Sequence, residues 1–226
     1  MTQSQWIPME IEGRRQETPT LVSFRMIPKL EETHFDFQAG QSVKISLAGR
    51  EGVFAIASEP EEKRFVEFLI KDQADSVGHE VCQLKAGDPM KISPPFGKGY
   101  PLERLKGKDV LLIGIGSALA PLRSLFKSIL RKNQQFGEVT FLYGARTLDE
   151  IPYRDEFDFW KKKIRLYLAI SQAESSAARV TELLSHLSFH PEKTVACICG
   201  TSAMQKEVTN LLENAGISKD NIFLNH

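Results

Sequence analysis

The chain has 226 residues, of which 42% are hydrophobic and 26% are charged, as is usual for a globular protein. Lys plus Arg and Asp plus Glu number 29 each, so the formal net charge is zero and no overall field favours nucleic acid or an anionic membrane as a partner. No apolar run approaches the roughly 20 residues of a membrane span, and the first ten residues lack the basic and apolar regions of a secretory signal.

The first half of the chain has the pattern of an all-β domain. Between residues 20 and 94, short runs rich in β-branched and aromatic residues are predicted as strands, namely 21–27, 42–48, 52–58, 64–71 and 89–93. Turn signals at 39–40 and 86–88 separate some of these runs, and one short helix is expected from about Val77 to Leu84. This spacing predicts an antiparallel β-barrel or a β-sandwich, and we expect the barrel.

From Asp109 the pattern changes to alternating strands and helices. The predicted strands are 109–116, 138–144, 164–170, 194–200 and 221–225, and the first of them is apolar throughout, as parallel strands buried on both faces are. Amphipathic helices follow the first four strands, and Gly216 stands where the last of these helices is expected to end. The series predicts a doubly wound α/β domain, an open parallel five-stranded sheet with helices on both faces.

The change of pattern falls in the polar segment 103–109, which predicts two domains. Residues 1–104 are expected to form the β-barrel domain, and residues 105–226 the α/β domain.

Three cysteines, Cys82, Cys197 and Cys199, have no spacing typical of a disulfide framework. We therefore expect a reducing compartment, either the cytoplasm or an organelle stroma. An iron–sulfur cluster usually needs four cysteine ligands, so none is expected in this chain.

The turn after the first parallel strand, residues 114–121, is a candidate phosphate site. Gly114 and Gly116 permit a tight turn and a close approach of phosphate, Ser117 follows, and Pro121 suits the first turn of the next helix. The alternative is an ordinary strand-to-helix turn, which also favours glycine. A second opening is expected at Cys199 and Gly200, before a helix predicted to start with a capping box of Ser202 and Gln205. Two helix N-termini at one sheet edge predict a crevice for an extended ligand.

Five motifs in chain order, with a short helix expected after the first, carry a resemblance to a known family: GVFAIAS, SPPFGKGYPL, LIGIGSALAPLRSL, LYGARTLDEIPYRDEF and CICGTSAMQKEVTNLLENAGI. From about residue 15 onward the chain resembles the ferredoxin–NADP reductase superfamily. The likeness is greatest to its small plant and algal fruit-protein-like members. The electron-transfer subunits of hydrogenase and dihydroorotate dehydrogenase resemble it more distantly.

The resemblance implies an FAD-dependent NAD(P)H oxidoreductase. FAD would lie in the barrel and NAD(P)H in the α/β domain, and a hydride would pass between them before electrons reach a protein or small-molecule acceptor. On the flavin side the resemblance implies binding by Phe54, Ala55, Ile56, Ala57, Ser58, Lys71, Ser76, Val77 and Gly78. On the nicotinamide side it implies Gly114, Gly116, Ser117, Pro121, Arg146, Ser171, Gln172, Gly200 and Met204. Cys199 would position the nicotinamide rather than act as a nucleophile, the alternative being a buried strand cysteine.

Two departures from the family pattern bear on these expectations. The flavin motif R-x-Y-[ST] becomes Gly52-Val53-Phe54-Ala55, without its arginine and hydroxyl, and Arg50 is a candidate substitute. The alternative for Phe54 is a core position, and the alternative for the whole chain is a nucleotide-binding or regulatory subunit without its own flavin. Gln172 stands where NADP-specific members have arginine, which favours NADH, although Arg146 leaves NADPH open.

Overall fold

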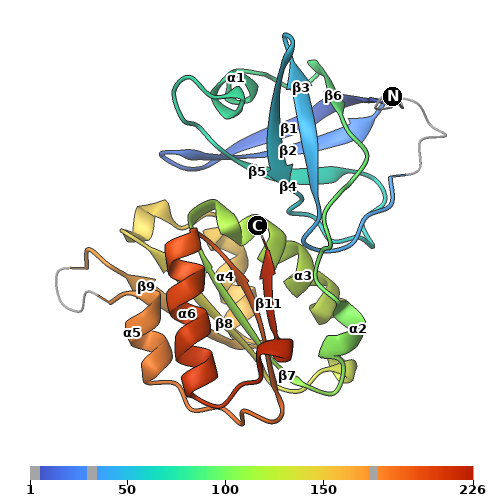
Figure 1. The fold of residues 1–226 in the computed structure, drawn as a ribbon. Coiled ribbons are helices and arrows are strands. Elements are labelled where there is room, and N and C mark those ends of the chain that lie inside the picture. The colour runs from blue at the N-terminus through green and yellow to red at the C-terminus, as the bar shows by residue number, and fades with distance from the viewer. Residues whose placement is uncertain (1–5, 30–34, 174–177, 226) are drawn as a thin grey trace.

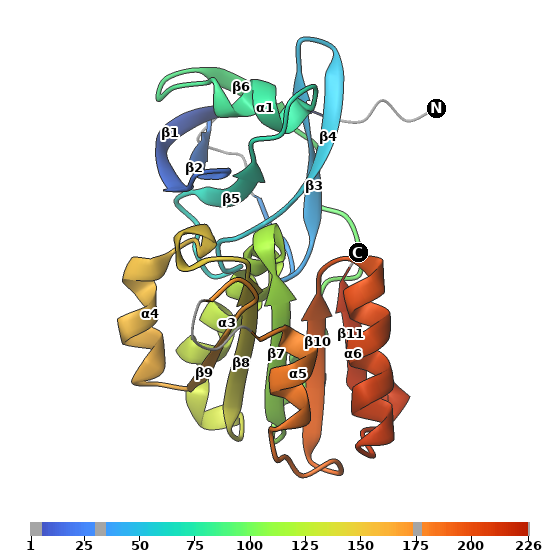
Figure 2. The same ribbon diagram turned by 90° about the vertical axis from the view of Figure 1, so that its left-hand side faces the viewer.

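The computed structural model describes residues 6–29, 35–173 and 178–225, and it consists of two lobes (Figures 1 and 2). The N-terminal lobe is built from antiparallel strands, and the C-terminal lobe is a parallel sheet covered by helices. Both halves of the predicted fold class are therefore confirmed. None of the helices in the described ranges is long and apolar enough to cross a membrane.

The N-terminal lobe is a six-stranded antiparallel sheet that curls toward a barrel. Its strands are β1 (Ile7–Thr18), β2 (Leu21–Pro28), β3 (Ser42–Leu47), β4 (Arg50–Ala55), β5 (Val66–Lys71) and β6 (Pro89–Ile92), in the order β4-β3-β6-β1-β2-β5. A bridge between Ile56 and Phe68, and a 2.7 Å hydrogen bond from the Ala57 N–H to the Glu67 carbonyl, connect the two edges of the sheet. The barrel interior is filled by apolar side chains that alternate along the strands.

Two features of this lobe differ from the sequence expectation. Strand β1 was not predicted, because past Ile11 most of its residues are partly or fully exposed and no apolar alternation marks them. The helix α1 (Val77–Cys82) stops two residues before Leu84, since the Gln83 N–H bonds back to carbonyls of the last turn. Ser76 caps its start and accepts a hydrogen bond from the His79 N–H at 3.1 Å.

The C-terminal lobe is the predicted five-stranded parallel sheet. Its strands are β7 (Asp109–Ile115), β8 (Val139–Ala145), β9 (Arg165–Ile170), β10 (Thr194–Cys199) and β11 (Ile222–Asn225), in the order β11-β10-β7-β8-β9. The helices are α2 (Leu102–Leu105), α3 (Leu119–Arg131), α4 (Arg154–Lys161), α5 (Val180–Ser185) and α6 (Ser202–Asn214). Figure 1 shows α5 and α6 in front of the sheet and α3 and α4 behind it, so both faces are covered.

Each face of this sheet has its own core. Alternate residues of β7, such as Leu112, pack with α3 and α4 around a cluster of Phe126, Phe141 and Trp160, whose rings lie 5.0–6.0 Å apart. The residues between them, such as Ile113, pack against α5 and α6. Burial on both faces explains why β7 is apolar throughout.

The ends of α6 correct one expectation and confirm another. Thr201, not Ser202, is the N-cap residue, and its hydroxyl accepts from the Met204 N–H at 3.3 Å. Gln205 makes no capping box, because its amide instead donates to the carbonyls of Gly200 and Asn225 at 3.1 and 2.8 Å. Gly216 follows the helix with a φ of +91°, as expected of a glycine at a helix C-terminus.

The chain passes between the lobes through α2, which the sequence did not predict. Leu105 of this helix is fully buried in the C-terminal core. The proposed domain division at residues 104 and 105 falls within α2 and stays a prediction.

Candidate functional site

A cleft of about 1190 Å³ lies between the lobes and receives residues from both. Its lower wall is the carboxyl edge of the parallel sheet, and its upper wall comes from β4, β5 and the start of α1. Fourteen of the residues expected at a cofactor site line it: Phe54, Ala55, Lys71, Ser76, Val77, Gly78, Gly116, Ser117, Pro121, Arg146, Ser171, Cys199, Gly200 and Met204. The fold therefore brings together residues that are up to 150 positions apart in the sequence, as from Phe54 to Met204 (204 − 54).

Five of the expected residues lie outside the lining. Ile56, Ala57 and Ser58 are fully buried where β4 meets β5, and the Ser58 hydroxyl accepts from the Glu67 N–H at 3.0 Å. Gly114 lies beneath α3, where a Cβ atom would collide with Leu122. Gln172 is exposed, and its N–H donates to the Arg146 carbonyl at 2.9 Å. Direct cofactor contact stays a prediction for these five residues and for the fourteen that line the cleft.

The turn after β7 is open to the cleft. Gly116 has a φ of +55°, and no described atom outside its own immediate chain lies within 4 Å of the position a Cβ would occupy. The Tyr143 hydroxyl donates to the Gly116 carbonyl at 2.9 Å and fixes the turn from below. Ala118, which replaces the second glycine of the family motif, has an ordinary φ of −63° and causes no backbone strain.

A second opening lies directly beside this turn. Strands β7 and β10 are paired in parallel, with Cys199 opposite Gly114, so the Gly200 turn and the Gly116 turn are neighbours. The chain order reverses at this point, because β8 and β9 continue from one side of β7 while β10 and β11 lie on the other. Open α/β sheets bind ligands at such a switch point.

The barrel-side wall, where the flavin is predicted to lie, is formed by β4, β5 and α1. A Cβ atom on Gly52 would lie 2.8 Å from Cε2 of Phe54 and 3.1 Å from Cβ of Val77. The Phe54 ring therefore lies across Gly52, in the space that the family's arginine would enter. Phe54 lines the cleft and also packs against the barrel core, and its stacking on a flavin stays a prediction.

Arg50 lies on the same wall and reaches the start of α1. Its Nη2 donates to the Asp75 carbonyl at 2.8 Å, and its Nη1 pairs with the Glu80 carboxylate. The side chain remains half exposed and lines the cleft. A guanidinium thus lies beside Ser76 although the family position, Gly52, carries no charge.

Comparisons with known proteins agree with this geometry. The model of the oxidoreductase NAD-binding domain family matches residues 112–210. The sulfhydrogenase 1 gamma subunit of Pyrococcus furiosus is 30% identical over 218 residues, covering 92% of this chain and 74% of that protein. The chain belongs to the ferredoxin–NADP reductase superfamily. One component of the Na(+)-translocating NADH-quinone reductase of a Marinomonas species is 29% identical over 195 residues, which cover 76% of this chain and about half (47%) of that component.

Solved structures show the same fold as this superfamily member. A ferredoxin NADP+ reductase from Neisseria gonorrhoeae with bound FAD and NADP has a TM-score of 0.84 at 20% identity, over 98% of both chains. The flavohem-like FAD/NAD-binding domain of nitric oxide dioxygenase from Vibrio cholerae has a TM-score of 0.85 at 19% identity, over 96% of this chain and 97% of that one. Assignment to the plant and algal fruit-protein-like subgroup stays a prediction.

Cys199 of this superfamily member lies at the cleft in its thiol form. Burial raises the pKa of the Cys199 thiol to about 12, although the Gly200 N–H lowers it slightly. A thiolate is the nucleophilic form of cysteine, so an uncharged thiol favours a packing role.

We expect Cys199 to react slowly with iodoacetamide. At pH 8 a thiol with a pKa near 12 is only about one part in 10⁴ thiolate, and the fraction grows tenfold with each further pH unit. Mass spectrometry of the alkylated native protein, with free cysteine as the reference thiol, measures this rate. Labelling of Cys199 as fast as the reference at pH 8 would contradict the packing role.

The far end of the cleft in this superfamily member carries a charged pair. Arg146 donates from Nη2 and Nε to the carboxylate of Glu150 at 2.7 and 3.1 Å, and both residues line the cleft. Arg179 and Glu207 also line it. Glu150 was not predicted from the sequence, although it follows Arg146 by four residues, a spacing at which opposite charges often pair. Arg179 and Glu207 were not predicted either, because no motif marks them.

Proposed function

We propose that this chain is an FAD-dependent NAD(P)H oxidoreductase that passes electrons onward to a separate acceptor. One observation carries the proposal: a single cleft extends from Phe54 on the barrel to the Gly116 and Gly200 turns at the switch point. The two cofactor sides that this chemistry requires therefore face each other. Membership of the superfamily supports the same reading.

The cleft suits extended dinucleotides. Its volume of about 1190 Å³ is above the roughly 300–1,000 Å³ of an ordinary small-molecule pocket. The space in front of Gly116 is free of described atoms, so phosphate could approach the backbone there. On the barrel side, Arg50 and Lys71 supply positive charge beside the segment 76–78.

Each lobe would have a distinct task. Phe54 would stack on the flavin, with Arg50 taking the place of the family's arginine near the pyrophosphate. The Gly116 and Gly200 turns would hold the nicotinamide nucleotide, and Cys199 would pack beside its ring. The bound cofactors supply the hydride chemistry. The residues align the two rings, which makes the transfer effectively unimolecular.

We further propose that the chain prefers NADH over NADPH. Glu150 already neutralises Arg146, so the charge available for a 2′-phosphate is reduced. Gln172 adds no positive charge at the other candidate position. A phosphate near Glu150 would also meet the repulsion of its carboxylate.

The variant Glu150→Gln should improve use of NADPH relative to NADH. Without the Glu150 carboxylate, Arg146 is free to donate one charge-assisted hydrogen bond to the 2′-phosphate of NADPH. We therefore expect kcat/KM for NADPH, divided by kcat/KM for NADH, to rise about tenfold. Asp149→Asn is a matched control, because Asp149 contacts Arg154 at 3.4 Å and does not line the cleft. An unchanged ratio in Glu150→Gln, or an equal change in both variants, would contradict this coenzyme preference.

A protein is the acceptor we favour. The two relatives named above are both parts of larger assemblies, a sulfhydrogenase and an NADH-quinone reductase. The acceptor of this chain is then expected to be a partner protein rather than a small molecule.

Absorption spectroscopy tests the proposed function. The purified protein, with FAD added, should show flavin bands near 450 nm (roughly, as any flavin does), and anaerobic NADH or NADPH should bleach them. A colourless protein that gains no band with FAD would instead support the alternative of a nucleotide-binding or regulatory subunit. Gly52 and Ala55 are the residues that favour that alternative.

A further inference from the structure

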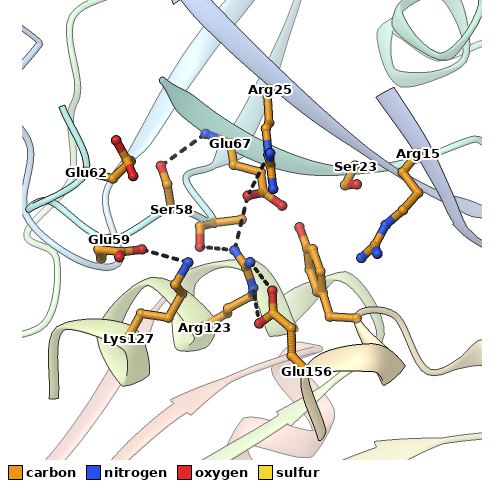
Figure 3. A network of polar contacts seen from close by, with 12 residues as sticks. Arg15, Ser23, Arg25, Ser58, Glu59, Glu62, Glu67, Arg123, Lys127 and Glu156 are labelled. Atoms are coloured by element: carbon orange, nitrogen blue, oxygen red, sulfur yellow. Dashed lines mark hydrogen bonds and ion pairs between the residues drawn. The ribbon is translucent and has the colours of Figure 1, made fainter. Parts of the chain in front are cut away.

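Arg123 of α3 is a buried cation at the junction of the two lobes, with only 2% of its side chain exposed. Its Nη1 donates to the Ala57 carbonyl at 2.9 Å and lies 3.5 Å from Oε2 of Glu67. Its Nε donates to Glu156 at 3.0 Å, and the guanidinium lies 4.1 Å from the centre of the Tyr153 ring. Figure 3 shows the guanidinium between the carboxylates of Glu67 and Glu156.

The charge of Arg123 is retained despite this burial. Burial disfavours the charged guanidinium, but the hydrogen bond to Glu156 and the charges of Glu67 and Glu156 raise the pKa of Arg123 above its ordinary value. Arg25 approaches Glu67 at 3.8 Å from the other side, so two cations face two anions. The cluster is therefore balanced in charge.

The lobes are held together elsewhere too, farther along α3 from the cleft. Glu59, which is nearly buried, pairs with Lys127 at 2.9 Å and with Arg131 at 2.8 Å. Lys127 and Arg131 lie about one and two helical turns after Arg123 on α3. These contacts hold the lobes together, but none of the three residues that make them lines the cleft.

Arg123 differs from these because two of its partners, Ala57 and Glu67, each lie two residues from a residue that lines the cleft. Arg123 itself follows Pro121 by two residues, on the helix that begins at the Gly116 turn. Ala57 follows the cleft residue Ala55 by two positions, and Glu67 precedes Leu69 by two on β5. One side chain thus connects the nicotinamide-side turn with both strands of the flavin-side wall.

We propose that Arg123 is a positioning residue that sets the distance between the nicotinamide turn and the flavin wall, and so the rate of hydride transfer, without touching either cofactor. This inference rests on the proposed function. The planar fork of arginine binds Glu156 through two nitrogens and Ala57 through a third, and lysine cannot reproduce that geometry. A small displacement of one reacting ring relative to the other slows such a transfer steeply.

Two variants of the FAD-loaded protein test this role. Arg123→Lys keeps the charge and loses the fork, and the double variant Arg123→Gln with Glu156→Gln removes one cation and one anion together. Stopped-flow reduction at increasing NADH gives the dissociation constant of NADH and the limiting rate of flavin bleaching. Dithionite, which needs no nucleotide site, measures reduction of the flavin independently of nicotinamide.

In both variants we expect flavin to be retained and NADH affinity to change by less than about threefold, while the limiting rate falls roughly 10- to 100-fold. Reduction by dithionite should keep its wild-type rate. The control Lys127→Gln removes one interlobe ion pair, leaves Glu59 with Arg131, and should keep the wild-type limiting rate even if its Tm falls.

A wild-type limiting rate in both variants overturns the positioning role and leaves the proposed function intact. The role is also overturned if only Arg123→Lys is slow, if both variants lose flavin or fail to fold, or if Lys127→Gln is equally slow, because each result indicates stability or charge rather than alignment. A wild-type protein that binds no FAD, or that NADH does not bleach, overturns the proposed function and this inference together.

Discussion

The variant Gly116→Val should bind NADH at least about 100-fold more weakly than the wild-type chain and keep its flavin. Gly116 has a φ of +55°, a conformation that costs a β-branched residue about 1–3 kcal/mol. The valine side chain would also project into space that is free of described atoms and that we assign to phosphate. The strain lowers the stability of the variant, whereas the obstruction lowers its affinity for NADH, and each 1.4 kcal/mol of lost binding free energy corresponds to a factor of ten in affinity. Titration of the FAD-loaded variant with NADH measures the loss.

Gly107→Val separates obstruction from backbone strain. Gly107 has a φ of +70°, its Cβ position is equally free of described atoms, and it does not line the cleft. This control should lose stability by a similar amount and keep its NADH affinity. Unchanged NADH binding in Gly116→Val would show that the nicotinamide nucleotide lies elsewhere.

The second large effect is expected on the flavin side. Arg50→Gln should weaken FAD binding by about 10- to 100-fold, which corresponds to the roughly 1.5–3 kcal/mol of a hydrogen bond to a charged group. Arg50 is half exposed in the cleft and held beside Ser76 by the Asp75 carbonyl and the Glu80 carboxylate. Because the family's arginine is absent at Gly52, this guanidinium is the nearest substitute on β4. Fluorescence titration with FAD measures the affinity.

Lys44→Gln is the matched control for Arg50→Gln. Lys44 lies on β3, next to β4, and pairs with Glu51 at 3.0 Å, but it does not line the cleft. Its replacement removes the same charge from the same hairpin and should leave FAD affinity within about twofold, as a screened surface charge does. Equal FAD affinity in Arg50→Gln and Lys44→Gln would remove Arg50 from the flavin site.

The coenzyme preference and the alignment by Arg123 depend on separate residues, because Arg146 and Glu150 line the cleft and Arg123 does not. Arg146 and Glu150 lie near the predicted 2′-phosphate position, whereas Arg123 lies beneath the junction of the walls. Their effects should therefore be independent. A change at Glu150 would alter the choice between NADH and NADPH, and a change at Arg123 would alter the limiting rate with either coenzyme.

Local patterns in the sequence predict both kinds of lobe and the glycine turn that follows β7. Apolar alternation, continuous apolar strands and amphipathic helices are local patterns, because each strand or helix must bury its own face. The glycine of the turn, Gly116, is also a local requirement, since its positive φ depends on the chain immediately around it. Strand β1 was not predicted, because much of it is exposed and shows no apolar alternation.

The contacts between polar side chains follow from the packing of distant segments and cannot be read from local patterns. The sequence could not show that Arg50 reaches the start of α1 or that the Ser58 hydroxyl accepts a hydrogen bond from β5. It also could not show that Thr201 rather than Ser202 caps α6. Arg123 and Glu67 are 56 positions apart (123 − 67) and carry no shared motif, yet they lie 3.5 Å apart at the lobe junction. The physical reason is that an ion pair depends on the distance and burial of both partners, and these are fixed only when separate elements pack together.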